Sequence, residues 1–376
     1  MKKILVSGGA GFIGSHLCNK LVASGYDVTV LDNLSEQVHG DPEKSDLYNS
    51  VKNKVLFIKG DVRRRDDWRL ALAGQDAVIH LAAETGTGQS MYEIDRYADV
   101  NVRGTALMLD LLAREKHQIK KIIVASSRAI YGEGKYLCTS HGTVYPSHRL
   151  EKDMRRGDFE IKCPQCGRTT EVIPTDEDSR LHPTSIYGIT KQTQEMLVLT
   201  AGRSLGIPSL AFRYQNVYGP GQSLSNPYTG ILSIFSTRFR HGNPVNIFED
   251  GRESRDFVYI DDVVTATIAG LEKNTADYLA INVGSGQATT VMTVAETLKK
   301  ALASDSTIEI SGNFRLGDIR HNIADTARLE RTLGTVPQTT FEDGIGRFME
   351  WVQTQPLAED KYDKSIEELK ETGLYQ

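Results

Sequence analysis

Long apolar runs are missing from this sequence of 376 residues. No stretch approaches the ~18 uninterrupted apolar residues of a membrane span. The first apolar run stops at Val6, too short for the roughly 7–15 apolar residues of a secretory signal. An excess of either charge is missing too, since 44 Lys and Arg face 49 Asp and Glu. We therefore expect a cytoplasmic protein that binds neither nucleic acid nor membrane.

Cysteine is also scarce, because four in the whole chain are too few for a disulfide scaffold. What is present is an ordinary 39% of hydrophobic residues, enough for a sizeable core. Apolar runs that resemble strands alternate with stretches that resemble helices: the runs are 2–8, 26–32, 55–61, 76–83, 120–127 and 209–217, and the helices 11–24, 95–114 and 184–206. This alternation predicts an α/β protein with a doubly wound parallel sheet.

The alternation breaks twice, and the breaks suggest how the chain is divided. Polar residues, Pro, Gly and clustered Cys fill 132–183, and a Gly/Pro-rich stretch follows Tyr218. We expect a nucleotide-binding domain at 1–131, continued by 184–218 and about 255–273. An inserted module would occupy 132–183, and a smaller C-terminal α/β lobe would comprise 219–254 and 274–376.

A glycine-rich turn follows the first predicted strand, with the pattern Gly8-x-x-Gly11-x-x-Gly14 before a helix. Such glycines let a dinucleotide pyrophosphate approach the helix N-terminus, whose free N–H groups favour negative charge. Asp32 ends the second strand, where a carboxylate accepts hydrogen bonds from the ribose hydroxyls and repels a 2′-phosphate. The pattern therefore favours NAD over NADP. Asp61 ends the third strand and would meet the adenine amine, although helix capping explains it nearly as well.

Tyr187 and Lys191 are spaced to share one face of a helix. An ammonium group beside a phenol favours the phenolate, which would lower the tyrosine pKa from ~10 and make it an acid/base group. Ser126 and Ser127 end the strand at 120–127, at the edge where open α/β sheets bind ligands. A serine hydroxyl there could hold the oxygen that Tyr187 deprotonates.

The insertion carries Cys138-x-x-His141 and Cys163-Pro-Gln-Cys166. Two such half-sites have the spacing of a tetrahedral zinc site, so we expect a zinc-ribbon-like module. With four protein ligands the metal would serve folding and not catalysis. His148 or His182 could replace His141 as the fourth ligand.

Motifs along almost the whole chain resemble the extended short-chain dehydrogenase/reductases, specifically the NAD-dependent sugar-nucleotide epimerase/dehydratase family. The motifs are SGGAGFIG, LDNLS, GDV, HLAA, NVRGT, SSRAIYG, YGITK, RYQNVYGPG, RDFVYIDD and RLGDIRH. The resemblance implies a Rossmann-type fold and a catalytic set of Ser127, Tyr187 and Lys191. It also implies an NAD site, shared by Tyr187 and Lys191, that is lined by Gly8, Gly11, Phe12, Ile13, Gly14, Asp32, Asn33, Asp61, Val62, Leu81, Ala82 and Ala83.

The resemblance further implies a nucleotide-sugar site. Its residues would be Glu84, Ser127, Arg128, Asn216, Asn226, Phe248, Arg255, Arg315 and Asp318. In it Asn216 and Asn226 would contact the diphosphate, Phe248 would cover the base, and Arg255 and Arg315 would grip the phosphates, as arginine forks do. Arg128 is unusual next to the catalytic serine, and we expect it to contact the sugar or Glu84, unless it forms a structural ion pair. Relatives of this fold usually dimerise through two helices, here 95–114 and 190–201.

The residues beside Ser127 narrow the choice among the reactions of this family. Family 4,6-dehydratases carry an Asp-Glu pair there and 3,5-epimerases a cysteine, whereas this chain has Arg128-Ala129. Asp32 argues against a reductase that exchanges NADPH. The expected enzyme is therefore an isomerase, a 4-epimerase of a nucleotide-diphosphate hexose with tightly bound NAD. A dehydratase or reductase of the same family, and a non-catalytic NAD-sensing protein, remain alternatives.

The two cysteine half-sites of the insertion, together with the motifs SSRAIYGEG, RYQNVYGPGQSLSNPYTG and IFEDG, resemble a subgroup that includes dTDP-L-rhamnose 4-epimerases. This likeness implies conversion of dTDP-L-rhamnose to dTDP-6-deoxy-L-talose, a step in polysaccharide biosynthesis. Epimerisation of a UDP-hexose or UDP-hexuronate is the main alternative.

Overall fold

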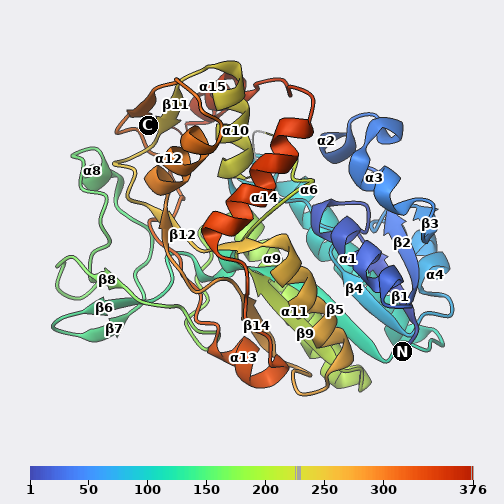
Figure 1. Cartoon of the computed structure of the whole chain (residues 1–376). Coiled ribbons are helices and arrows are strands. Elements are labelled where there is room, and N and C mark those ends of the chain that lie inside the picture. Colours follow the sequence, from blue (N-terminus) through green and yellow to red (C-terminus); the bar gives the residue numbers. More distant parts are fainter. Residues whose placement is uncertain (225, 227–229, 374, 376) are drawn as a thin grey trace.

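Seven parallel strands form the central sheet of this computed structural model, which describes residues 1–224, 226, 230–373 and 375 (Figure 1). Their order is β14-β9-β5-β4-β1-β2-β3, and every neighbouring pair is parallel. The strands are β1 (Lys3–Ser7), β2 (Asp27–Asp32), β3 (Leu56–Lys59), β4 (Ala77–His80), β5 (Lys121–Ser127), β9 (Ser209–Tyr214) and β14 (Ala280–Val283). The predicted Rossmann-type α/β fold is confirmed. Ser225 and residues 227–229 of the quoted Gly/Pro-rich motif lie outside the described residues.

Helices cover both faces of the sheet, as continuous apolar strands require. On one face α1 (Phe12–Ala23) and α11 (Ile260–Glu272) pack together. On the other face lie α4 (Arg65–Leu72), α7 (Gly104–Arg114) and α9 (Ile186–Leu205), with the Trp68 ring fully buried among them. Ser185 caps α9 by accepting from the Gly188 N–H, and left-handed Gly206 ends it.

The helix expected over 95–114 is present as one continuous right-handed run. It consists of α6 (Ile94–Tyr97), the π-helical turn η2 (Ala98–Arg103) and α7. Gly104 begins α7, and a Cβ atom at this position would lie 3.0 Å from Val62 Cγ2. The Gly104 carbonyl accepts a hydrogen bond from Trp68 Nε1 at 3.1 Å. A π-helical turn of this kind often marks a functional site, and here it carries Asn101 toward α9.

The C-terminal lobe packs α12 (Val291–Ala301) between α10 (Ile231–His241) and α14 (Phe341–Thr354). Short parallel pairs join β11 (Val245–Ile247) to β16 (Ile308–Ile310) and β10 (Asn216–Tyr218) to β13 (Phe257–Tyr259). The remaining elements here are the antiparallel β12 (Ser254–Arg255) and β15 (Thr289–Thr290), α13 (Ala327–Leu333) and α15 (Tyr362–Glu371). Near the sheet lie α2 (Glu36–His39), η1 (Pro42–Lys44), α3 (Asp46–Val51), α5 (Thr87–Ser90) and η3 (Arg128–Tyr131).

The insertion forms its own small antiparallel sheet, which projects away from the central one (Figure 1). Its strand order is β7-β6-β8, with β6 (Tyr136–Cys138), β7 (Gly142–Val144) and β8 (Glu171–Val172), and α8 (Glu151–Met154) follows β7. Tyr136, Val144 and Ile161 fill its core. The division of the chain into domains with the boundaries given above stays a prediction.

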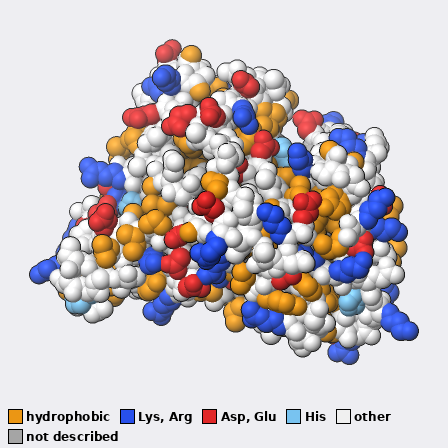
Figure 2. Space-filling view, turned by 60° about the horizontal axis from the view of Figure 1, so that its bottom comes forward, with side chains coloured by type: hydrophobic (Ala, Val, Ile, Leu, Met, Phe, Trp, Pro, Cys, Tyr) orange, Lys and Arg blue, Asp and Glu red, His pale blue; other side chains and the backbone are white. Residues whose placement is uncertain are grey.

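The surface carries both charges in mixture. On the face shown in Figure 2, basic and acidic side chains alternate and hydrophobic ones lie between them. Among the described residues, no helix combines the length and apolar character needed to cross a bilayer.

Candidate functional site

The glycine turn joins β1 to α1 and presses against the end of β4. At Gly8, whose φ is +72°, a Cβ atom would lie 2.7 Å from the Ala82 nitrogen, and at Gly14 it would lie 2.1 Å from the Gly8 oxygen. Side chains are therefore excluded at both positions. Gly11, as N-cap, supplies no side-chain cap to α1, so the N–H groups of the first turn, which includes Phe12 and Ile13, point out of the helix. This cradle fits a pyrophosphate.

Two carboxylates lie beside this cradle. Asp32 accepts hydrogen bonds from the Ala10 and Leu34 N–H groups at 3.0 and 2.9 Å. Burial raises the pKa of Asp32, and these bonds oppose the rise. Asp61 forms a 2.7 Å ion pair with Arg63, and its expected contact with the adenine amine stays a prediction. Burial opposes that pair, but the Arg63 hydrogen bonds still lower the pKa of Asp61.

The remaining residues of the expected NAD site lie nearby. Asn33 accepts from the Ser35 N–H at 3.1 Å and also bonds to Asp61. Val62 is buried, and the stretch 81–83 follows directly on β4. The turn, the ends of β2 and β3, and the end of β4 therefore share one edge of the sheet.

Ser127 and Tyr187 meet at the carboxyl end of β5. Ser127 is buried and hydrogen-bonds the Tyr187 side chain, which is half-buried. Burial raises the pKa of Tyr187, while the Ser127 bond and the positive charge of Arg128 act in the opposite direction. The net shift is therefore upward and not the expected lowering. Lys191 donates to Gln194 Oε1 at 2.8 Å, and its expected action on Tyr187 stays a prediction. Burial lowers the pKa of Lys191 to about 7.

Arg128 follows Ser127 and faces the same space. Its Nε donates to Asn216 Oδ1 at 2.9 Å, and its terminal amino groups have no hydrogen-bond partner among the described residues. Burial, reinforced by the charge of Arg255, lowers the pKa of Arg128 to about 10. The expected contact with Glu84 is wrong, because Glu84 forms a 2.9 Å ion pair with Arg96. Arg128 therefore offers an unoccupied guanidinium fork next to Ser127.

The expected phosphate arginines share one carboxylate. Asp318 accepts from Arg255 at 3.2 Å and from Arg315 at 2.7 Å. Burial opposes ionisation, but the charges of Arg315 and Arg255 hold the pKa of Asp318 well below its usual range. The Phe248 ring has two neighbours. The Arg315 guanidinium lies 5.1 Å from its centre, and the Tyr375 ring packs edge-on against it with 5.5 Å between the ring centres.

Asn226 lines a hollow of about 720 Å³, together with Arg96, residues 35–40 and part of α15. This hollow lies between the nucleotide-binding sheet and the C-terminal lobe.

The insertion is tied to the segment 313–321 that carries Arg315 and Asp318. Arg149 donates to the Asp318 carbonyl at 3.0 Å and pairs with Glu249 at 2.7 Å. Glu133 accepts from the Arg320 N–H at 2.8 Å, and burial raises the pKa of Glu133 to about 7. None of this network could be read from residue spacing, because its members come from three distant parts of the chain.

Three cysteines and one histidine converge in the insertion. The possible ligand atoms of Cys138, His141, Cys163 and Cys166 all lie within 4.8 Å of one another. The Cys138 and Cys166 sulfur atoms are 3.7 Å apart, and His141 Nδ1 lies 3.6 Å from Cys138 Sγ and 3.5 Å from Cys163 Sγ. Of the three histidines considered, His141 is the one in the cluster. His148 and His182 instead lie near each other, and burial lowers the pKa of His182.

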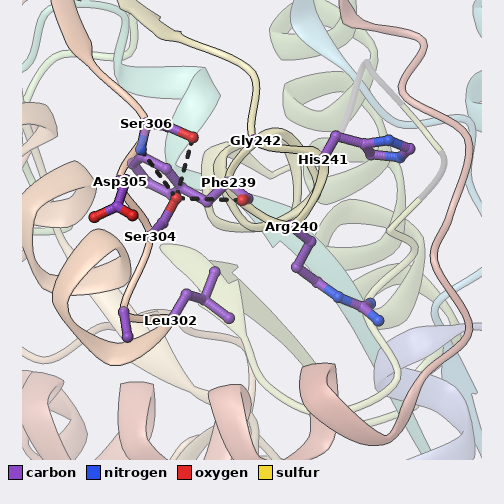
Figure 3. Close-up of a pocket in the computed structure, with 9 residues that line it drawn as sticks. Phe239, Arg240, His241, Gly242, Leu302, Ser304, Asp305 and Ser306 are labelled. Carbon is purple, nitrogen blue, oxygen red and sulfur yellow. Dashed lines mark hydrogen bonds between the residues drawn. The ribbon is translucent and has the colours of Figure 1, made fainter.

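A second hollow, of about 630 Å³, is unrelated to these residues. It lies between the end of α10 and the loop after α12, and Figure 3 shows Ser304 bonded to the Phe239 carbonyl in its wall. Arg240 and His241 project away from that bonded group.

Several polar residues behind Lys191 were missed. They are Gln194, Thr105 and His80, all buried. The available signal was the three-residue spacing of Lys191 and Gln194 on one helix face, and the motifs HLAA and NVRGT already contain the other two.

Comparisons with known proteins agree with this architecture. The model of the "NAD dependent epimerase/dehydratase family" matches residues 4–148 and 163–284, omitting part of the insertion. A dTDP-L-rhamnose 4-epimerase of Burkholderia thailandensis is 37% identical over 93% of this chain and 95% of its own.

Two solved structures are also similar. The UDP-glucose 4-epimerase of Thermotoga maritima, with UDP-glucose, has a TM-score of 0.76 and 31% identity over 93% of this chain and 98% of its own. The UDP-glucuronic acid 4-epimerase of Bacillus cereus, in complex with UDP-glucuronic acid and NAD, has a TM-score of 0.76 and 27% identity, covering 93% and 99%. These matches confirm the expected family and class of enzyme: the chain belongs to the NAD-dependent epimerase/dehydratase family.

Proposed function

We propose that this protein inverts C4 of a nucleotide-diphosphate hexose, using NAD that stays bound through the cycle. The observation that carries the proposal is the meeting of Ser127 and Tyr187 beside a glycine cradle, with Arg128 where a dehydratase would need an acid. The relatives named 4-epimerases support the same reaction.

NAD fits the residues at the turn. A Cβ atom is excluded at Gly8 and Gly14, and the first turn of α1 offers free N–H groups. Asp32 keeps lone pairs for ribose hydroxyls, since each of its oxygens has one backbone donor. The nicotinamide supplies the acceptor and later the donor of a hydride at C4.

Tyr187 is the acid/base group in this mechanism. Tyr187 would take the C4 hydroxyl proton during oxidation at C4, with the Ser127 bond and the charge of Arg128 stabilising the phenolate against its burial. Ser127 would hold the same oxygen, and the 4-keto sugar would turn about its diphosphate to present its other face for reduction. Tyr187 gives the proton back to the oxygen, so that atoms and charge balance over the cycle.

The sequence likeness favours dTDP-L-rhamnose as substrate, with dTDP-6-deoxy-L-talose as product. A specific observation favours a second candidate. The free fork of Arg128 next to Ser127 suits a carboxylate, because guanidinium groups bind carboxylates with two parallel bonds. A UDP-hexuronate would supply that carboxylate on the carbon next to C4.

We also infer that the insertion holds a structural zinc ion. Tetrahedral bonds of about 2.3 Å place neighbouring sulfur ligands about 3.8 Å apart, close to the 3.7 Å between Cys138 and Cys166. Cys138, His141, Cys163 and Cys166 would fill all four positions.

A homodimer in the cytoplasm completes the proposal. Ile189 and Met196 on α9 are 48% and 57% exposed, and apolar side chains on one of the two expected dimer helices support pairing of this face.

The decisive experiment incubates purified protein with UDP-, dTDP-, GDP- and CDP-sugars, including dTDP-L-rhamnose and UDP-glucuronic acid. NMR follows inversion at C4, and the nucleotide released on denaturation is identified. We expect inversion without added reductant and NAD in the released fraction. A keto product or accumulating NADH would instead indicate a dehydratase or a net oxidoreductase.

A further inference from the structure

A continuous chain of buried polar groups leads away from Lys191 into the core. Lys191 Nζ donates to Gln194 Oε1 at 2.8 Å, and Gln194 Nε2 donates to Thr105 Oγ1 at 2.8 Å. His80 Nε2 lies 2.9 Å from the same Thr105 oxygen, and His80 Nδ1 lies 2.6 Å from Ser7 Oγ. None of the five residues is more than 2% exposed.

A single backbone carbonyl sets the direction of these bonds. Thr105 Oγ1 donates its proton to the Asn101 carbonyl at 2.6 Å, so the Thr105 oxygen can only accept from its other neighbours. Gln194 must therefore turn its NH₂ group toward Thr105 and its carbonyl oxygen toward Lys191. With this direction His80 carries its proton on Nε2, toward Thr105, and accepts from Ser7 on Nδ1. The 3.4 Å approach of Gln194 Nε2 to His80 Nε2 is then a contact between two donors and not a hydrogen bond.

We propose that Gln194 is a positioning residue for Lys191, presenting it with an acceptor whose direction is fixed through Thr105 by the Asn101 carbonyl. The inference rests on the proposed function for its consequence in catalysis, but not for the contact itself. An amide reversed at this position would face the ammonium group with its own N–H groups, which the Thr105 bond prevents.

Burial disfavours the charged form of this lysine, so a neutral acceptor matters there. Tyr187 lies one turn before it on α9. On β4, burial, with the Lys191 charge second, lowers the pKa of His80 to about 3, so that His80 is neutral. Glu195, the next acid on α9, is engaged by Arg213 at 2.5 Å. Hydrogen bonding to the charged form favours it, so Gln194 helps keep Lys191 protonated against its burial.

The test measures the Lys191 pKa directly by NMR of protein labelled with ε-¹³C-lysine, with Lys191→Arg assigning the signal. Gln194→Met removes the acceptor and should lower this pKa by about one unit, whereas Gln194→Glu places a carboxylate there and should raise it by about one unit. Thr105→Val frees the amide and should lower it by less. Gln192→Met, the same change two residues away on α9, should leave it in place.

Shifts of opposite sign in the two Gln194 variants support the inference, since a purely structural loss would not change direction with charge. No shift, or shifts of the same sign, would overturn it. With an epimerised sugar, the alkaline limb of kcat against pH should move with the lysine pKa; an unmoved limb would refute the link to catalysis. If the unmodified protein inverts no sugar, the proposed function fails while the NMR result still decides the contact.

Discussion

Arg255 and Asp318 form a partly buried ion pair with 3.2 Å between Nη2 and Oδ1. The rest of the Arg255 fork is also spent inside the protein, on the carbonyls of Ser254 at 2.9 Å, Arg320 at 2.9 Å and Ile319 at 2.7 Å. Arg315 has instead one ion pair with Asp318, and 40% of its side chain is exposed. The N–H donors of Arg255 thus stabilise the backbone around residues 318–320, whereas Arg315 keeps N–H donors for a ligand.

This difference predicts two separable effects. Arg255→Lys leaves buried carbonyls without donors, because one ammonium group cannot reach three carbonyls, and should lower the free energy of unfolding by about 2 kcal/mol. Arg315→Lys should lower it by less than half as much and chiefly raise KM. Urea denaturation and initial rates measure the two. Equal losses of stability in both variants would contradict the assignment.

Tyr187→Phe should reduce turnover by about 10³-fold, since it removes the group that we propose moves the C4 proton, and general acid/base groups contribute ~10²–10⁴-fold. Initial rates of C4 inversion by NMR measure the effect. Tyr97→Phe is the matched control: its ring packs edge-on against Tyr187 at 6.4 Å, but its hydroxyl donates to the Thr85 carbonyl. The control should keep most of its turnover, and near-normal turnover in Tyr187→Phe would disprove the mechanism.

Six of the seven strands of the central sheet could be predicted from the sequence because they are apolar runs between glycine and charged residues. The seventh, β14, was not predicted, since it has four residues and lies in the stretch that was expected to form the C-terminal lobe. The π-helical turn over 98–103 could not be predicted, since Asn101 within it bonds to Glu84 and Thr190, which are remote in the chain. The direction of Lys191 was missed for the same reason. Its Tyr187 spacing is local, but Gln194 is held by Thr105, and only the fold brings that residue close.

Arg128 predicts how the site discriminates between sugars. If its fork binds a C6 carboxylate, Arg128→Met should raise KM for UDP-glucuronic acid by about 10–100-fold, the value of a charge-assisted bond of ~1.5–3 kcal/mol. KM for dTDP-L-rhamnose should change much less. Rates with both sugars at several concentrations measure the ratio. An equal rise for both sugars would place the fork on the diphosphate, which the two share.

Glu253 predicts a pH-dependent stability. It is 7% exposed and lies 3.8 Å from Arg320, and burial raises its pKa to about 7. An acid whose folded pKa is raised favours folding while neutral, and this contribution is lost as the pH rises from about 4.5 through about 7. Glu253→Gln should therefore stabilise the protein by about 2 kcal/mol at pH 8, and the gain should shrink toward pH 5. Tm across this range measures it. Exposed Glu296→Gln should give the curve of the unmodified protein, and a Glu253→Gln gain that does not depend on pH would refute the explanation.

The cysteine cluster predicts one zinc ion for each chain. Metal analysis of the purified protein should find it, and Cys163→Ser should lose it, because the cluster then offers only three of four ligands. Cys18→Ala is the control, since Cys18 is buried on α1 in the main core and far from the insertion. It should keep the metal despite a packing loss. Because Arg149 and Glu133 tie the insertion to the segment that holds Asp318, removal of the metal by a chelator should also raise KM for the nucleotide sugar. Unmodified protein without metal, or Cys163→Ser with a full complement, would show that these four side chains form a packed thiol cluster instead.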